Sequence, residues 1–177
     1  MKNLQAIQKT TKVFRILSLI AMICSFAAAL FALTATGIWA AYGTRDALAG
    51  SSVVHTIINA MDRGGYEATL AVLMYDFVWC LIEGILLIFA YQYLTAELKD
   101  GTPFTEGGAK MVKSLGIKMI ALPCVGIVIS SVISETMDAN MSRYLSNDAT
   151  VAFGICLILF SLVLRYGAEL ERKGAVI

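Results

Sequence analysis

The chain has 177 residues, of which 58% are hydrophobic and only 15% are charged, and its formal net charge is +1. Soluble domains are about 45–50% apolar and about 25% charged, so this composition excludes an ordinary soluble domain and is typical of an integral membrane protein. A net charge this close to zero gives no general basic field, so we expect no direct binding to nucleic acid.

Four long apolar runs follow one another along the chain. A spanning helix needs about 20 predominantly apolar residues, whereas spanning strands would give alternating segments of about ten residues, and the sequence has none of these. We therefore predict an all-α fold, a four-helix transmembrane bundle that forms a single integral membrane domain over residues 1–177. The predicted spans are about 14–42, 68–96, 115–135 and 149–168.

Lysine and arginine are sorted by position, which predicts the orientation of the chain. Cytoplasmic segments next to spanning helices carry an excess of these residues. Of the 14 basic residues, 11 lie in the N-terminal segment up to Arg15, in the middle loop and the helix entry up to Lys118, or in the tail from Arg165. We therefore predict that both termini and the middle loop are cytoplasmic. The outer side keeps only Arg45, Arg63 and Arg143.

The first outer loop, residues 43–67, contains apolar residues at helical spacing. We expect a short amphipathic helix here, which either packs as part of the loop or forms a lid over a ligand site. Its apolar positions are Val53, Val54, Ile57, Ile58 and Met61.

Two acidic residues interrupt the second apolar run. Asp76 and Glu83 are seven residues apart, so a helix places them on one face. Acids inside a membrane are costly, so we expect both to point into the bundle and to find partners there. Three serines of the third span, Ser130, Ser131 and Ser134, lie at a suitable depth for Asp76.

This intramembrane polar site has two interpretations. The acids form a proton or cation relay or a polar ligand site, or they make buried contacts that fix helix packing. A single chain of four helices rarely forms a transport path alone, so the first interpretation implies a homo-oligomer.

The remaining reactive residues give little support to an enzyme. Each span has one cysteine, but no C-x-x-C motif and no neighbouring histidine supply metal-ligand spacing. The one histidine, His55, lies in the outer loop, and no common catalytic motif occurs. We expect a protein without catalytic residues, metal or cofactor. The cysteines are Cys24, Cys80, Cys124 and Cys156.

The cytoplasmic stretch KDGTPFTEGG, residues 99–108, has the chemistry of a tight turn between two helices. Gly101 tolerates positive φ, and Pro103 presets a helical φ after an extended step. Thr105 is a suitable N-cap, with Glu106 in the first turn. Phe104 is left at the turn, apolar and in need of cover.

The same stretch resembles a known family. The pattern of Gly101 and Pro103–Glu106, followed by Leu115-Gly116, is similar to the domain of unknown function 2975, and Arg165–Leu170 is similar to that family's ending. These are small bacterial membrane proteins with four predicted spans and no established activity. The tail of this chain, residues 171–177, departs from the acidic ending frequent in the family, which weakens any role specific to the tail.

The resemblance implies a protein of the bacterial cytoplasmic (inner) membrane, whose relatives are often encoded beside a small helix-turn-helix regulator. Our leading hypothesis is a sensing or regulatory membrane partner of such a regulator, contacted through the turn residues Gly101, Pro103, Phe104, Thr105 and Glu106. The alternative is a small oligomeric ion-coupled transporter that uses Asp76 and Glu83. Basic residues near the turn and in the tail could equally contact anionic lipid; these are Lys110, Lys113, Arg172 and Lys173.

Overall fold

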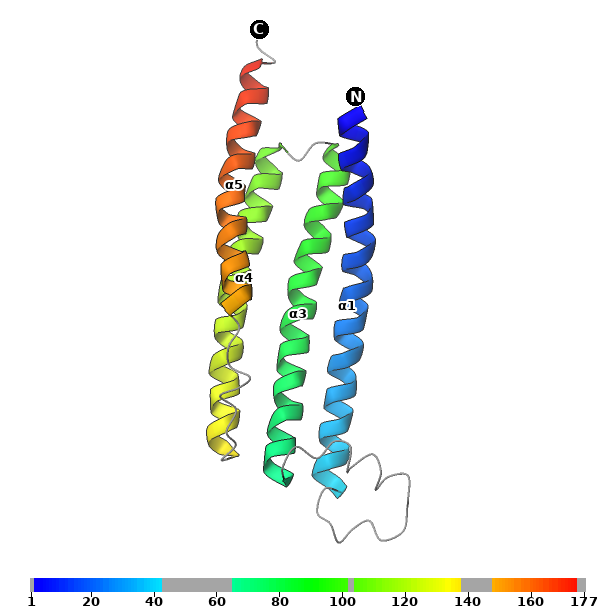
Figure 1. The fold of residues 1–177 in the computed structure, drawn as a ribbon, viewed down its shortest axis with the longest axis vertical. Helices are drawn as coiled ribbons and strands as arrows, with labels where there is room; N and C mark the ends of the chain where they lie inside the picture. Colours follow the sequence, from blue (N-terminus) through cyan, green and yellow to red (C-terminus); the bar gives the residue numbers. More distant parts are fainter. Residues whose placement is uncertain (1, 43–64, 102–103, 138–147, 175–177) are drawn as a thin grey trace. The chain divides into compact units, whose positions relative to one another are not determined.

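The protein is described here by a computed structural model. It describes residues 2–42, 65–101, 104–137 and 148–174. These residues form four α-helices and no strand, which confirms the predicted all-α four-helix bundle (Figure 1). The helices are α1 (Lys2–Tyr42), α3 (Tyr66–Asp100), α4 (Glu106–Thr136) and α5 (Asp148–Gly174).

All four helices are long and apolar enough to cross a membrane. Large apolar side chains cover their outer surfaces, and Phe31, Val128 and Phe153 are each more than 60% exposed. Soluble proteins rarely expose so much contiguous apolar surface, whereas lipid tails contact it without penalty. The architecture is therefore that of a multi-pass membrane protein in contact with a bilayer.

The helices extend beyond the predicted spans, mainly at the ends expected to be cytoplasmic. α1 begins at Lys2 rather than near 14, α4 begins at Glu106 rather than near 115, and α5 continues to Gly174. Apolar run length marks only the part of a helix that can lie in lipid. The polar extensions contain no proline, so the backbone hydrogen-bond ladder continues through them.

Contacts between helices divide the chain into two compact units. The first comprises Met1–Cys24, Glu83–Cys124 and Asn147–Ile177, and the second comprises Ser25–Ile82 and Val125–Ser146. Every lysine and arginine among the described residues lies in the first unit. The charge sorting seen in the sequence is thus also a property of the folded units.

The first unit is held together by close helix packing and by polar contacts. A Cβ atom added at Gly116 of α4 would lie 2.7 Å from the backbone oxygen of Gly154 in α5, so only glycine permits this approach. α1 and α3 are joined by a hydrogen bond from Thr11 Oγ1 to Glu97 Oε1, at 3.1 Å. One buried apolar cluster of this unit consists of Ala109, Val112 and Leu164.

The second unit has its own core and a tryptophan at its end. Ala71 of α3 and Ile133 of α4 are buried together. Trp39 Nε1 donates a hydrogen bond to the Tyr66 carbonyl oxygen at 3.0 Å, and the two rings stack with centroids 6.4 Å apart. Aromatic residues with a polar atom favour the membrane–water interface, so this pair is suited to the end of the spanning region.

Three sequence predictions fall outside the described residues. They are the amphipathic helix of the first loop, His55 within that loop, and Pro103 in the turn between α3 and α4.

Candidate functional site

The predicted intramembrane site combines exposed acids of α3 with serines of α4 that are buried or half-buried. Asp76 and Glu83, both on α3, are exposed. Both acids are thus exposed rather than buried, and a relay or ligand role for them stays a prediction. Apolar residues are distributed nearly evenly around α3, so the sequence contains no apolar face from which the inner side of this helix could be recognised.

The three serines of α4 lie in different environments. Ser130 is fully buried, and its hydroxyl has no hydrogen-bond partner among the described residues. Ser131 Oγ donates to the Ile127 carbonyl oxygen of its own helix at 2.9 Å. Ser134 is half-buried. A contact between these serines and Asp76 stays a prediction.

The four cysteines lie on separate helices, and none of them forms a disulfide. Cys24, Cys124 and Cys156 are exposed and Cys80 is half-buried. Within the described ranges, no group of three or more His, Cys, Asp or Glu residues is placed to hold a metal ion.

The two described ends of the segment between α3 and α4, at Gly101 and at Thr105, have the predicted local structure. Gly101 has φ of 76°, and its amide donates to the Glu97 carbonyl oxygen at 3.0 Å, which ends α3. Thr105 Oγ1 accepts a hydrogen bond from the Gly108 amide at 2.9 Å, so Thr105 is the N-cap of α4. Glu106 is the first residue of that helix, where a negative charge is favourable.

The Phe104 ring packs against α5. A Cβ atom added at Gly167 would lie 2.5 Å from Phe104 Cδ1, closer than real contacts allow. The aromatic ring therefore packs directly over the backbone of α5 at a position that only glycine fits. Because Phe104 keeps 38% of its surface exposed, it contributes both to internal packing and to the outer surface.

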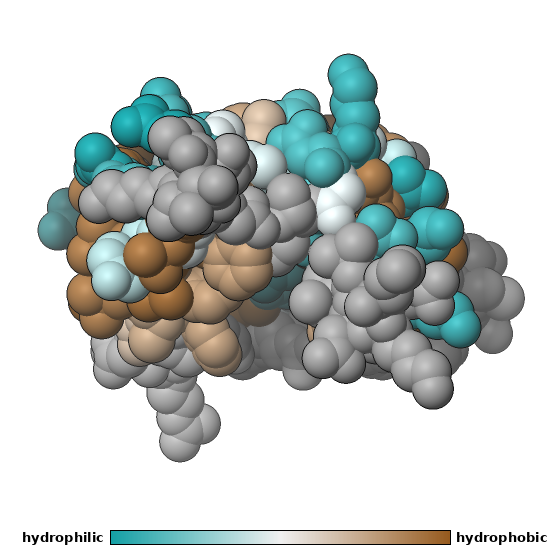
Figure 2. Space-filling model, turned by 90° about the horizontal axis from the view of Figure 1, so that it is seen from above, coloured by the Kyte–Doolittle hydropathy of each residue, from teal (hydrophilic) through white to brown (hydrophobic). Residues whose placement is uncertain are grey.

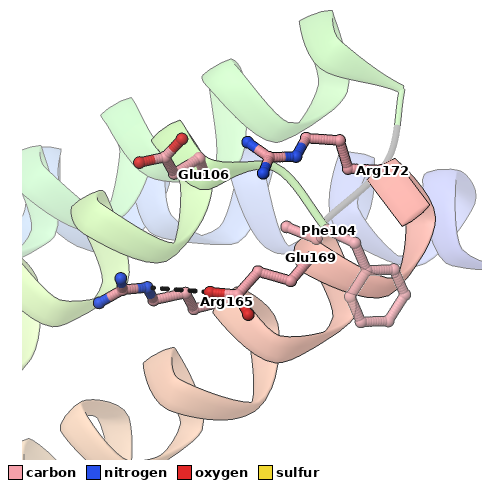
Figure 3. A pocket seen from close by; sticks show the side chains of 6 residues that line it. Phe104, Glu106, Arg165, Glu169 and Arg172 are labelled. Carbon is pink, nitrogen blue, oxygen red and sulfur yellow. Dashed lines mark ion pairs between the residues drawn. The ribbon is translucent and has the colours of Figure 1, made fainter. Parts of the chain in front are cut away.

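A pocket of about 450 Å³ opens beside Phe104. We call it the turn pocket. Figure 3 shows its side chains, with Arg172 reaching from α5 towards the side of the pocket on which Glu106 lies. The pocket combines one aromatic ring with two acids and two arginines. Its lining residues are Phe104, Glu106, Arg165, Ala168, Glu169 and Arg172.

Ion pairs and hydrogen bonds organise the charges around the turn pocket. Lys110 Nζ lies 3.1 Å from Glu106 Oε1, and Arg165 Nε lies 3.6 Å from Glu169 Oε1. The hydrogen bond and positive charge of Lys110 lower the pKa of the Glu106 carboxyl, and Arg165 and Arg172 act in the same direction. Glu106 therefore remains a carboxylate at neutral pH. The pocket offers charges of both signs to a ligand.

Figure 2 shows the molecule from the end that carries the start of α1 and the end of α5, where hydrophilic residues gather. The turn pocket belongs to the first unit, whose polar segments supply these residues.

Sequence reasoning missed the part that α5 plays in this site. Turn chemistry and the family resemblance single out the turn residues, but helical periodicity contains no information on which helix covers the Phe104 ring. The sequence does contain one signal for α5, because the family resemblance is carried by two stretches, the turn residues and Arg165–Leu170. In the structure these two stretches meet where Phe104 contacts Gly167.

Comparison with protein-family models, with curated proteins and with solved structures gives no match to this chain.

Proposed function

We propose that this protein is a sensing or regulatory protein of the bacterial inner membrane, with both termini and the α3–α4 turn in the cytoplasm. It binds a cytoplasmic helix-turn-helix regulator through the turn pocket. The observation that carries the proposal is the contact of Phe104 with α5, which presents a half-covered aromatic ring among charges of both signs. Aromatic and arginine side chains are enriched in protein–protein interfaces.

The identity of the partner rests on the family resemblance. The two similar stretches form one surface, which is expected if that surface, rather than each stretch separately, serves a common purpose. The sorting of basic residues favours a cytoplasmic location for it. The absence of catalytic motifs in the sequence favours binding over catalysis.

The alternative function, an ion-coupled carrier, draws on the two acids of α3. Since Asp76 and Glu83 are exposed, a path lined by both acids requires a further surface to cover them. A second copy of the chain would supply it. The carrier function therefore depends on an oligomer, whereas the regulatory function does not.

Co-purification tests the regulatory function. The tagged full-length protein is extracted from its native membrane with the neighbouring DNA-binding protein expressed at its natural level. Wild-type protein should retain that regulator, whereas Phe104→Asp should lose it because a carboxylate replaces the aromatic contact. Val13→Asp is the matched control, since Val13 is an exposed apolar residue of α1 outside the turn pocket and outside both similar stretches, and it should keep the regulator.

A second variant distinguishes a loss of binding from misfolding of Phe104→Asp. Arg172→Glu reverses one exposed charge without changing the ring contact, and it should also weaken retention of the regulator. The proposed function would be overturned if the wild type retained no cytosolic protein, or if all variants retained the regulator equally.

Reconstitution tests the carrier function. If Glu83 couples an ion, liposomes with the wild type should show a proton-coupled flux that Glu83→Gln abolishes while the helical content is preserved. No flux in the wild type, or an unchanged flux in the variant, excludes this alternative.

A further inference from the structure

A second pocket, of about 230 Å³, lies between α4 and α5 and shares only two residues with the turn pocket. We call it the interhelical pocket. Three of its side chains are basic and one is acidic, so its local charge is positive. Its lining residues are Glu106, Ala109, Lys110, Lys113, Ser161, Leu162 and Arg165.

The interhelical pocket lies where charged sequence meets apolar sequence on both helices. Lys110 and Lys113 are the last charged residues before the predicted span 115–135 of α4, and Arg165 directly follows the uncharged run 149–164 of α5. Ala109 and Leu162 provide apolar wall, and Leu162 is 56% exposed. If these helices span a bilayer, the basic groups lie at headgroup depth and Leu162 lies beside the acyl chains.

Lys113 is the cation of this pocket that the fold leaves available. Lys110 is paired with Glu106 at 3.1 Å, and Arg165 is paired through Nε with Glu169 at 3.6 Å. Lys118, one turn deeper in α4, donates to Ser114 Oγ at 2.9 Å and lies 3.7 Å from the centroid of the Phe89 ring. Lys113 is exposed and forms no ion pair among the described residues. An external anion would therefore meet an uncompensated positive charge.

We propose that the interhelical pocket binds the headgroup of an anionic phospholipid, with the phosphate against Lys113 and Arg165 and an acyl chain along Leu162. Basic pockets between spanning helices suit anionic headgroups. The presence of an apolar wall next to the cations favours a lipid over a free phosphate ion. Glu106 and Arg165 line both pockets, but Phe104 lines only the turn pocket, so a Phe104 variant separates lipid binding from binding of the regulator.

The test compares lipid retention by the full-length protein. Protein released from nanodiscs of equal parts phosphatidylglycerol and phosphatidylcholine is measured by native mass spectrometry. The wild type should retain phosphatidylglycerol preferentially. Lys113→Gln should reduce this preference about fivefold, as expected for one lysine near an anionic surface, and Lys110→Gln/Lys113→Gln should reduce it further. Lys113→Arg should keep it.

Lys12→Gln is the matched control, because Lys12 is an exposed lysine of α1 just before an apolar run and lies outside the pocket. It should leave the preference unchanged. An equal loss in this variant would show diffuse charge attraction and overturn the proposal, as would an unchanged preference in Lys113→Gln. Excess inorganic phosphate should not displace the lipid, and displacement would identify a soluble phosphate ligand instead. Phe104→Asp should retain phosphatidylglycerol like the wild type.

Discussion

Phe104 and Gly167 are the two residues on which the candidate site depends. The ring needs a position without a side chain on α5, and Gly167 supplies it because a Cβ atom there would lie 2.5 Å from the ring. Glycine inside a helix normally costs about 1 kcal/mol relative to alanine. The close contact therefore explains a residue that helix propensity alone would disfavour.

Replacement of Gly167 by alanine should consequently lower stability despite the better helix propensity of alanine. Gly37→Ala, in α1, is the control, since nothing lies within 4 Å of the added Cβ, and it should be neutral or stabilising. Thermal unfolding of both variants in detergent checks this. A higher melting temperature for Gly167→Ala would mean that the ring moves aside freely.

The N-cap of α4 gives a second prediction about a single residue. Thr105→Ala removes the hydroxyl that accepts the Gly108 amide at 2.9 Å, and it should cost about 1 kcal/mol of stability. Thr105→Ser keeps an acceptor oxygen and should stay close to the wild type. Measured free energies of unfolding of the two variants test this prediction. Equal losses of stability in Thr105→Ala and Thr105→Ser would contradict the assignment of Thr105 as the N-cap.

Among the helices, α4 shows how glycine sets helix separation. At Gly116 an added Cβ would meet the backbone oxygen of Gly154, whereas at Gly126 it would meet the terminal methyl of Ile82 at 2.6 Å. Backbone cannot move aside without shifting a helix, but the end of a side chain can change rotamer. The two glycines therefore differ in their tolerance of substitution.

We expect Gly116→Ala to destabilise the protein clearly more than Gly126→Ala. The comparison is matched because both changes add one methyl group to the same helix. Melting temperatures measured under one detergent condition are sufficient. A larger loss for Gly126→Ala would contradict the close approach of α4 and α5.

Much of the helix arrangement could be predicted from the sequence, and part of it could not. Uncharged runs such as Ile16–Tyr42 predicted the spans, because run length directly reflects bilayer thickness. The turn at Gly101 and Thr105 was also predictable, since its chemistry is local. The exposure of Asp76 and Glu83 was not predictable, because an evenly apolar helix such as α3 does not reveal which side faces its neighbours. The contact of Phe104 with Gly167 was not predictable because it joins distant segments.

The exposure of Glu83 leads to a prediction for α3. An acid near the centre of a spanning helix costs about 3 kcal/mol of insertion free energy. Glu83→Leu should therefore increase membrane insertion and leave the helical content unchanged, as measured by insertion efficiency and circular dichroism. Loss of folding in this variant would show that Glu83 makes a structural contact.

For the molecule as a whole, orientation connects the fold with both proposals. All described basic residues belong to the first unit, together with the turn pocket and the interhelical pocket. A regulator in the cytoplasm can reach the turn pocket only if this part of the first unit faces the cytoplasm. The prediction of cytoplasmic termini is thus the central claim.

Cysteine accessibility in intact cells tests this claim most directly. In a variant with the four native cysteines replaced by alanine, Lys99→Cys and Glu135→Cys each place one thiol at an exposed position near opposite ends of the spanning helices. A membrane-impermeant maleimide should label Glu135→Cys from outside and should label Lys99→Cys only after permeabilisation. Labelling of Lys99→Cys in intact cells, with Glu135→Cys protected, would contradict the orientation and the proposed cytoplasmic partner with it.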